Sequence, residues 1–263
     1  MQAAYVTSGE TGLVHALLSP TSVTTNVAGG SVTVDCETNY PFEDVLSYSI
    51  TAEEPLDFYV RQPTWASGAT LSQQSSFDPE TGLHKISLPA GASTFTYIIE
   101  TAIRTEPRAN DTVAVYRGQL LYAAEISAKV TSTGPHAYHN ETLYPANYAP
   151  PQARDYTMIN TTEWNIAIDP STIIYHPRAA QATSYGQGAA IDPLPTPIFA
   201  SGAPPMYMTV QSCLIDWPLF MDSVPGSPIP KSERKCLSEA FETKLVPYGS
   251  AKVRMTELPT IDL

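Results

Sequence analysis

The sequence is poor in charged residues, and in basic residues above all. Only 15% of its 263 residues are charged, and 14 Lys and Arg stand against 26 Asp and Glu, for a formal net charge of −12. Proteins that bind nucleic acid or anionic membranes do so through clustered Lys and Arg, whereas these residues are scattered singly here. The composition therefore argues against nucleic acid and membrane surfaces as partners.

Long apolar runs are also absent. No stretch approaches the roughly 18 apolar residues of a transmembrane helix, and residues 1–9 lack the basic and apolar regions of a signal peptide. Three Asn-x-Thr sequons nevertheless predict glycosylation at Asn110, Asn140 and Asn160. Together they favour a secreted, extracellular parent protein whose signal lies outside this chain or was removed.

Cysteine is scarce, with three residues in the chain. Cys213 and Cys236 bracket a loop rich in Pro and Ser, and a disulfide between them would suit an oxidising compartment. Cys36 lies in an alternating strand and is interpreted as a buried small hydrophobic residue. No spacing of Cys and His suggests zinc, so we expect neither a metal nor another cofactor.

Catalytic patterns are equally hard to find. Asp35 and Glu37 share one face of a strand at roughly 7 Å, but they are interpreted as its solvated face. His136 and His139 have the spacing of metal ligands, yet they lie in a loop without a third ligand nearby. The sequence contains no Gly-x-Ser-x-Gly motif. No catalytic residue is therefore assigned.

What the chain does contain is β-forming sequence. Its 24 prolines make long helices hard to place, and Gly, Pro, Asn and Asp clusters separate short runs of Val, Ile, Thr, Tyr and Phe. The runs predict strands at Gly12–Leu18, Ser31–Thr38, Val45–Ala52, Leu56–Arg61, His84–Leu88, Thr94–Thr101, Thr112–Tyr116, Leu120–Ile126, Trp164–Ile168, Met206–Ile215, Phe241–Val246 and Ala251–Leu258.

This pattern predicts an all-β fold of two antiparallel β-sandwich, jelly-roll-like modules with long Pro- and Tyr-rich loops. The expected first sandwich covers residues 1–107 and the second covers residues 108–263, with the break in the polar stretch near Thr105–Asn110. The long loops are Ser132–Asp155 and His176–Pro205. We expect them to be ordered excursions that pack on a sandwich or form an interface.

Tyrosines are concentrated in these loops and leave two interpretations open. Exposed aromatic rings on a β-sandwich can stack on sugar rings, whereas buried ones would fix the loops to the sandwich or to a neighbour. The candidate carbohydrate-binding residues are Tyr138, Tyr144, Tyr148, Tyr175 and Tyr185, with Tyr156 in the same group of loop residues.

The last part of the chain, Lys244–Pro259, is the most informative. Two short apolar runs flank a Pro-Tyr-Gly turn, which predicts a pair of strands at the end of the sequence. The second run alternates the apolar residues Val253, Met255 and Leu258 with the charged residues Lys252, Arg254 and Glu257. It is interpreted as a closing strand with one apolar face.

Five separated segments of the sequence resemble segments of one protein family. In order, they are Thr38–Phe42, Phe58–Ala66, Val113–Ala123, Glu163–Ile168 and Leu245–Pro259. They resemble the C-terminal β-sandwich region of the β-L-arabinofuranosidase-like glycoside hydrolases, family 127 and its relatives, and the sequons suggest a fungal secreted member. The pattern departs from the family at Gln62 and Gln119, which puts the packing there in question rather than the fold.

The resemblance implies a catalytic (α/α)₆ barrel N-terminal to the sandwiches. That barrel would hold a glutamate acid/base and a zinc-bound cysteine nucleophile within a Cys-Cys pair. No Cys-Cys pair occurs in this sequence, so no catalytic residue is carried over.

Three hypotheses follow. The first is a non-catalytic accessory portion that braces a catalytic barrel or a partner, with self-association through an apolar surface as a related outcome. The second is a carbohydrate-binding module that uses the loop tyrosines to bind a polysaccharide. The third is glycoside hydrolase activity in complex with a separate barrel.

Overall fold

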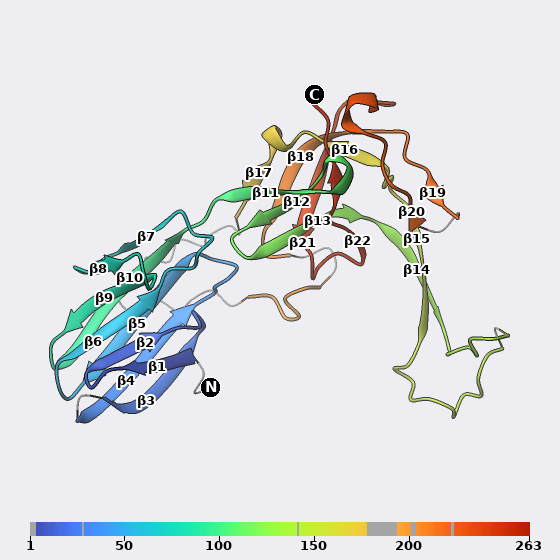
Figure 1. Ribbon diagram of the computed structural model, residues 1–263. Coiled ribbons are helices and arrows are strands. Elements are labelled where there is room, and N and C mark those ends of the chain that lie inside the picture. Colours follow the sequence, from blue (N-terminus) through green and yellow to red (C-terminus); the bar gives the residue numbers. More distant parts are fainter. Residues whose placement is uncertain (1–3, 28, 141, 178–193, 201–203, 222–223) are drawn as a thin grey trace. The chain divides into compact units, whose positions relative to one another are not determined.

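The computed structural model describes residues 4–27, 29–140, 142–177, 194–200, 204–221 and 224–263. Within this part of the chain the regular structure is almost entirely strand, interrupted by short 3₁₀ turns, and the predicted all-β class is confirmed (Figure 1). No helix of the described residues is long and apolar enough to cross a membrane.

The chain forms two compact units that interleave along the sequence. The first comprises Met1–Arg104, Tyr116–Leu121 and Tyr175–Met206, and the second comprises Thr105–Val115, Tyr122–Ile174 and Tyr207–Leu263. The boundary between residues 107 and 108 stays a prediction. The polar stretch that suggested it is not a loop, because most of it forms strand β11 (Ile103–Arg108).

Two five-stranded sheets build the first unit. One has the order β1-β2-β6-β9-β8 and the other β3-β4-β5-β10-β7. All their pairings are antiparallel except β2 with β6, which run parallel. The strands are β1 (Tyr5–Ser8), β2 (Gly12–His15), β3 (Thr21–Val27), β4 (Gly30–Thr38), β5 (Val45–Ala52), β6 (Leu56–Arg61), β7 (Gly68–Leu71), β8 (Ser76–Asp78), β9 (Leu83–Leu88) and β10 (Gly91–Glu100).

The core of this unit follows from strict alternation along its strands. In β4, Val32, Val34 and Cys36 are buried while Asp35 and Glu37 lie on the other, more accessible face. Successive side chains of a strand point to opposite faces, so the interpretation of the two carboxylates as a solvated face is confirmed. Burial also raises the pKa of the Cys36 thiol to about 12, which leaves it protonated and unreactive at neutral pH.

His15 is a polar residue in this apolar core. Its side chain is fully buried, its Nδ1 lies 2.8 Å from the Tyr48 hydroxyl, and its ring stacks on Tyr5 at a centroid distance of 4.4 Å. Burial disfavours the charged imidazolium and lowers the pKa of His15 to about 4. The residue therefore stays neutral at physiological pH.

We predict that the first unit loses stability on mild acidification. The pKa of His15 is about 4 in the folded protein and about 6.5 in the unfolded chain, so the unfolded chain binds more protons between these values. The contribution of neutral His15 to the free energy of unfolding is fully present above pH 6.5. It decreases as the pH falls toward 4, and about 2 kcal/mol of it is lost at pH 5. Burial also lowers the pKa of His84, which acts in the same direction.

Denaturant unfolding at pH 8 and pH 5 measures this loss. The variant His15→Phe keeps a ring against Tyr5 without a titrating group, and most of the difference between the two pH values should disappear in it. An unchanged difference in His15→Phe would contradict the assignment.

One nine-stranded sheet is the centre of the second unit, although Tyr116–Leu121 and the last two residues of β17 are assigned to the first. Its main path is β11-β12-β13-β21-β18-β16, and β17, β22 and β23 pair with β18, β13 and β12. The strands after β11 are β12 (Thr112–Arg117), β13 (Leu120–Ile126), β16 (Ile166–Ile168), β17 (Ile174–His176), β18 (Tyr207–Leu214), β21 (Phe241–Pro247), β22 (Val253–Met255) and β23 (Leu258–Pro259). The unit also contains the short ribbon of β19 (Leu219–Phe220) and β20 (Val224–Pro225), and the turns η2 (Ala109–Asp111), η3 (Pro170–Thr172) and η4 (Lys231–Glu233).

The disulfide predicted between Cys213 and Cys236 is present and joins β18 to the segment after η4, with a Cα–Cα distance of 5.5 Å. Cys213 is fully buried in a cluster with Ala167, Ile215 and Trp217. The bridge therefore fastens an irregular loop to the apolar side of the sheet.

The closing strand differs from its prediction. Ala251–Leu258 is not one strand but two, since β22 pairs with β13 and β23 pairs with β12. Val253 and Met255 differ by two positions and share a face, but Leu258 has the opposite parity and cannot continue that face. Thr256 and Glu257 interrupt the strand and separate β22 from β23.

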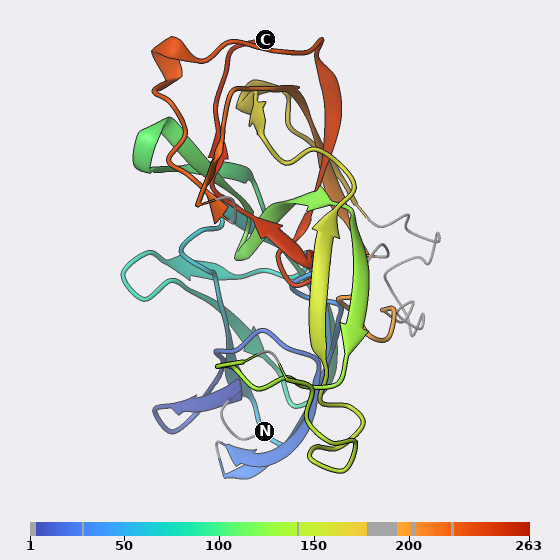
Figure 2. The same ribbon diagram turned by 90° about the vertical axis from the view of Figure 1, so that its right-hand side faces the viewer.

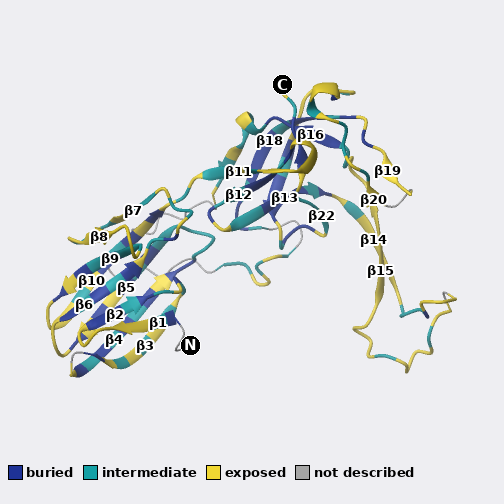
Figure 3. Cartoon of the chain, viewed as in Figure 1, coloured by how far each residue is buried: buried dark blue, intermediate teal, exposed yellow. Residues whose placement is uncertain are grey.

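A separate two-stranded ribbon, called the arm here, replaces part of an expected loop. It pairs β14 (Ala128–Thr133) with β15 (Asp155–Asn160). The described residues between them, 134–140 and 142–154, are called the tip loop. Figure 2 shows the two strands side by side in green and yellow. Almost every arm residue is exposed, in contrast to the buried strands of the sheet (Figure 3).

Candidate functional site

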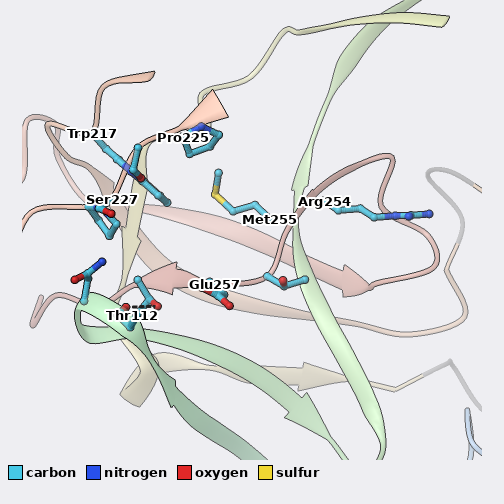
Figure 4. A pocket seen from close by; sticks show the side chains of 12 residues that line it. Thr112, Trp217, Pro225, Ser227, Arg254, Met255 and Glu257 are labelled. Carbon is cyan, nitrogen blue, oxygen red and sulfur yellow. Dashed lines mark hydrogen bonds between the residues drawn. The ribbon is translucent and has the colours of Figure 1, made fainter. Parts of the chain in front are cut away.

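A pocket in the second unit gathers residues from several segments. Its volume is about 490 Å³, and we call it the Trp217 pocket. Figure 4 shows Trp217, Pro225 and Ser227 on one side and Glu257 and Thr112 on another. The described residues that line it are Ala109, Asn110, Thr112, Trp217, Pro225, Gly226, Ser227, Pro228, Arg254, Met255, Thr256 and Glu257.

Arg234 fixes the wall formed by the turn η2, although its side chain does not line the pocket. Only 6% of Arg234 is exposed, and its guanidinium donates to the backbone carbonyls of Asn110 and Asp111, the latter at 2.9 Å. It also donates to the carbonyls of Ile229 at 2.9 Å and Thr260 at 2.8 Å. Since burial disfavours its charge, the pKa of Arg234 is lowered from its usual value.

These bonds hold η2 in an unusual conformation. Asn110 and Asp111 have φ angles of 56° and 51°, in the left-handed region that Asn and Asp tolerate better than most residues. The guanidinium supplies a donor to both carbonyls of this turn. The Asp111 carbonyl also accepts from the backbone amide of Thr260 at 3.3 Å. The Asn110 side chain is therefore presented from a fixed turn.

Trp217 fixes the opposite wall. Its ring is almost fully buried and packs against Trp164 at a centroid distance of 5.3 Å. Its Nε1 donates a 2.6 Å hydrogen bond to the carbonyl of Gly226. Because Pro225 and Pro228 restrict the backbone on either side, the loop that lines the pocket is held against the indole.

The third wall is the break between β22 and β23. Arg254 extends its guanidinium over the ring of Tyr248 at 4.7 Å and donates to the carbonyl of Ala251 at 3.1 Å. Glu257 is exposed and makes no side-chain hydrogen bond or ion pair with any residue in the described part of the chain. The lining thus combines the stem of Arg254, one carboxylate, small hydroxyl and amide groups, and apolar side chains.

A second pocket of about 490 Å³ lies on the same unit and contains Glu125, Glu163 and Glu242 among its lining residues. The Glu125 carboxylate pairs with Lys244 at 3.1 Å. In the described part of the chain, no three His, Cys, Asp or Glu side chains converge closely enough to hold a metal ion.

The structure stacks two of the predicted tyrosines on each other and places a third in the same loop. Tyr138, Tyr144 and Tyr148 all belong to the tip loop, where Tyr144 and Tyr148 stack at a centroid distance of 3.8 Å. Tyr175 belongs to the first unit, and the Arg117 guanidinium covers its ring at 4.0 Å. Tyr185 lies outside the described residues. None of these tyrosines is among the described lining residues of either pocket.

The three sequon asparagines occupy different settings, and all are exposed. Asn110 lies in η2 and lines the Trp217 pocket. Asn140 lies in the tip loop, where its Oδ1 accepts from the backbone amide of Thr142. Asn160 ends β15, and its Nδ2 donates to the carbonyl of Thr162.

Sequence reasoning missed the pocket and the arginine behind it. Arg234 lies in a polar stretch that looks like a surface loop. One of its four acceptors, Ile229, is near in the sequence, whereas Asn110, Asp111 and Thr260 are distant. One local signal indicated the third wall of the pocket. Met255 and Leu258 are three positions apart, so they cannot share a face of one continuous strand, and the strand must be interrupted between them.

No family model and no curated protein matches this sequence. Similar folds occur among solved structures. A GH127 β-L-arabinofuranosidase from Geobacillus stearothermophilus T6 is 16% identical with a TM-score of 0.56, and the match covers 98% of this chain and 34% of that one. A structure described as a glycoside hydrolase is 15% identical with a TM-score of 0.58, covering 98% and 37%. A GH127 β-arabinofuranosidase is 13% identical with a TM-score of 0.54, covering 98% and 36%.

These likenesses show a shared fold, and they confirm the fold that the five sequence segments suggested. This chain spans about a third of the length of the structures that it matches. Its fold is that of a portion of glycoside hydrolases.

Proposed function

We propose that this chain is the non-catalytic β-sandwich portion of a β-L-arabinofuranosidase-like glycoside hydrolase, and that it braces a catalytic barrel or a partner. The observation that carries the proposal is the coverage of the matches. Nearly the whole chain corresponds to about one third of those enzymes.

The state of the cysteines supports the proposal. A cysteine nucleophile must be accessible and able to ionise. Cys213 and Cys236 are joined in a disulfide, and Cys36 is buried with its pKa raised to about 12. All three cysteines of the sequence are thus accounted for without a nucleophile.

The arm supports a bracing role and provides a contact surface. An isolated two-stranded ribbon is marginally stable in water, and the register places Val130 opposite Met158. Alternation puts Tyr156 on that same face, and these three side chains are 43–60% exposed. The face formed by Val130, Tyr156 and Met158, called the apolar arm face, would gain stability by packing against a partner.

Charged substitutions on the arm test this role. The double variant Val130→Lys, Met158→Lys should weaken association with a co-expressed barrel at least about tenfold, because charge would be buried at the contact. The matched control Thr131→Lys, Thr157→Lys changes a facing pair on the other face and should leave association intact. Pull-down and analytical ultracentrifugation measure both, and equal affinities would exclude the apolar arm face as the contact.

Activity and binding assays on the chain alone test the lack of catalysis. We expect no turnover of arabinofuranosides and no saturable binding on a glycan array. Turnover that disappears when a carboxylate such as Glu163 or Glu242 is replaced would refute the non-catalytic assignment. Saturable binding without turnover would instead favour a carbohydrate-binding module.

The tip loop favours that module as a second candidate. The rings of Tyr144 and Tyr148 lie nearly parallel, with an interplanar angle of 7°, and Tyr148 and Tyr138 are largely exposed. Parallel exposed rings offer flat apolar surfaces for sugar stacking. If the loop binds glycan, the double variant Tyr138→Ala, Tyr148→Ala should abolish array binding, while Tyr175→Ala should not.

A further inference from the structure

Asn110 combines two independent features. It begins the sequon Asn110-Asp111-Thr112, and it is among the residues that line the Trp217 pocket. Its backbone is held by Arg234, so the side chain is presented from a fixed turn. A glycan attached there would start at the edge of a cavity.

We propose that the Trp217 pocket is a saccharide-binding site that holds the first sugar residues of an N-linked glycan on Asn110. The glycan would act as a covalently tethered ligand that fills the pocket. This inference does not depend on the accessory role proposed above, since it concerns a modification within the second unit.

The size and lining of the pocket fit a neutral sugar. A volume of about 490 Å³ lies within the range of roughly 300–1,000 Å³ that is usual for small-molecule sites. A sugar ring has apolar C–H faces and hydroxyl edges, and the pocket offers Pro225 and Met255 to the first and Ser227 to the second. Glu257, whose carboxylate has no described partner, can accept from a hydroxyl group.

The charges of the lining favour a neutral ligand over an anion. Glu257 contributes a carboxylate to the lining, while the Arg254 guanidinium extends away from the other labelled side chains in Figure 4. Arg254 is in addition engaged with the ring of Tyr248 and the carbonyl of Ala251. Anion sites usually offer an excess of donors without a carboxylate beside them.

The tether removes the need for high affinity. A ligand on a short linker experiences an effective concentration in the millimolar range. With roughly 10 mM effective concentration and a pocket affinity of roughly 1 mM, the sugar would be docked about nine-tenths of the time. A shallow site with few polar contacts is sufficient for that.

Asn140 is the internal control. It is exposed in the tip loop and is not among the described lining residues of either pocket. A glycan on Asn140 would start away from the two described pockets and should remain in solvent.

Site-resolved deglycosylation tests the inference. The chain is expressed in a secreting eukaryotic host, and glycopeptide mass spectrometry measures occupancy at Asn110 and Asn140. The native protein is then treated with an endoglycosidase that cleaves within the glycan core. Cleavage at Asn110 should be about tenfold slower than at Asn140, as expected for a sugar docked nine-tenths of the time. After denaturation the rates should converge.

Pocket variants show whether the protection comes from the pocket. Glu257→Ala should accelerate cleavage at Asn110 several-fold and leave Asn140 unchanged. The matched control Lys252→Ala removes an exposed charge of the same segment that is not a described lining residue, and it should change neither rate. Protection that persists unchanged in Glu257→Ala would overturn the assignment of Glu257 and of the pocket.

Three further outcomes would overturn the proposal. The first is an unmodified Asn110 in protein whose Asn140 is occupied, and the second is equal native cleavage rates at the two sites. The third is found by titrating Asn110→Gln with free chitobiose and with free arabino-oligosaccharides. Tight, micromolar binding of a free sugar, with no protection of the tethered one, would assign the pocket to a free oligosaccharide.

Discussion

Replacing Arg234 with methionine is expected to lower the free energy of unfolding of the second unit by about 3–5 kcal/mol. The guanidinium donates to four backbone carbonyls, on Asn110, Asp111, Ile229 and Thr260. Methionine keeps much of the buried stem but leaves these acceptors without their donor, and each buried unsatisfied group costs about 1–3 kcal/mol. The total stays below the sum because water can reach some carbonyls and Thr260 also donates to Asp111.

Denaturant unfolding monitored by tryptophan fluorescence measures this loss, since Trp217 lies in the same unit. Arg154→Met is the matched control. Arg154 also donates to a backbone carbonyl, that of Ser132, but it is exposed on the arm. Its replacement should cost less than about 1 kcal/mol. A loss below 1 kcal/mol in Arg234→Met would show that the turn η2 does not depend on the guanidinium.

Removing the disulfide is expected to have the second largest effect. The double variant Cys213→Ala, Cys236→Ala should be less stable by about 3 kcal/mol, because the bridge closes a loop over a sequence separation of 23. In thermal unfolding this corresponds to a shift of roughly 10 °C for a unit of this size. The loop contains Trp217 and Arg234, so the Trp217 pocket should open together with it.

Cys36 provides the control for this experiment. The variant Cys36→Ala retains the bridge, so a reductant should lower its melting temperature by the same amount as in the wild type. In the double variant the reductant should have no effect. A reductant effect that persists there would show that the Cys213–Cys236 bridge is not its source.

Strand prediction succeeded where one face of the strand is buried. The predicted bounds Val45–Ala52, Leu56–Arg61 and Leu120–Ile126 are those of β5, β6 and β13. In such strands the apolar side chains recur every second position, and the sequence carries that period. Strands without a buried face gave no such signal, which is why β14 and β15 were not predicted as strands and their inner ends fell within the expected loop Ser132–Asp155.

The pairing of Cys213 with Cys236 could also be predicted. The prediction depended only on the loop that the two residues bracket and on the expectation of an oxidising compartment. The closing strand was predicted in the right place but as one element. Its two halves, β22 and β23, pair with β13 and β12. Which strand each half pairs with depends on the arrangement of the whole sheet.

By itself, the sequence determined an all-β fold, the disulfide and a resemblance to a portion of family 127 enzymes, because these depend on local period, spacing and composition. The tertiary structure decided which side chains meet. It placed Arg234 under the turn of Asn110, covered Tyr175 with Arg117, and set Asn110 at a pocket rather than on open surface. These contacts join residues more than 50 positions apart, and the partner of such a residue is fixed only when the intervening strands have packed.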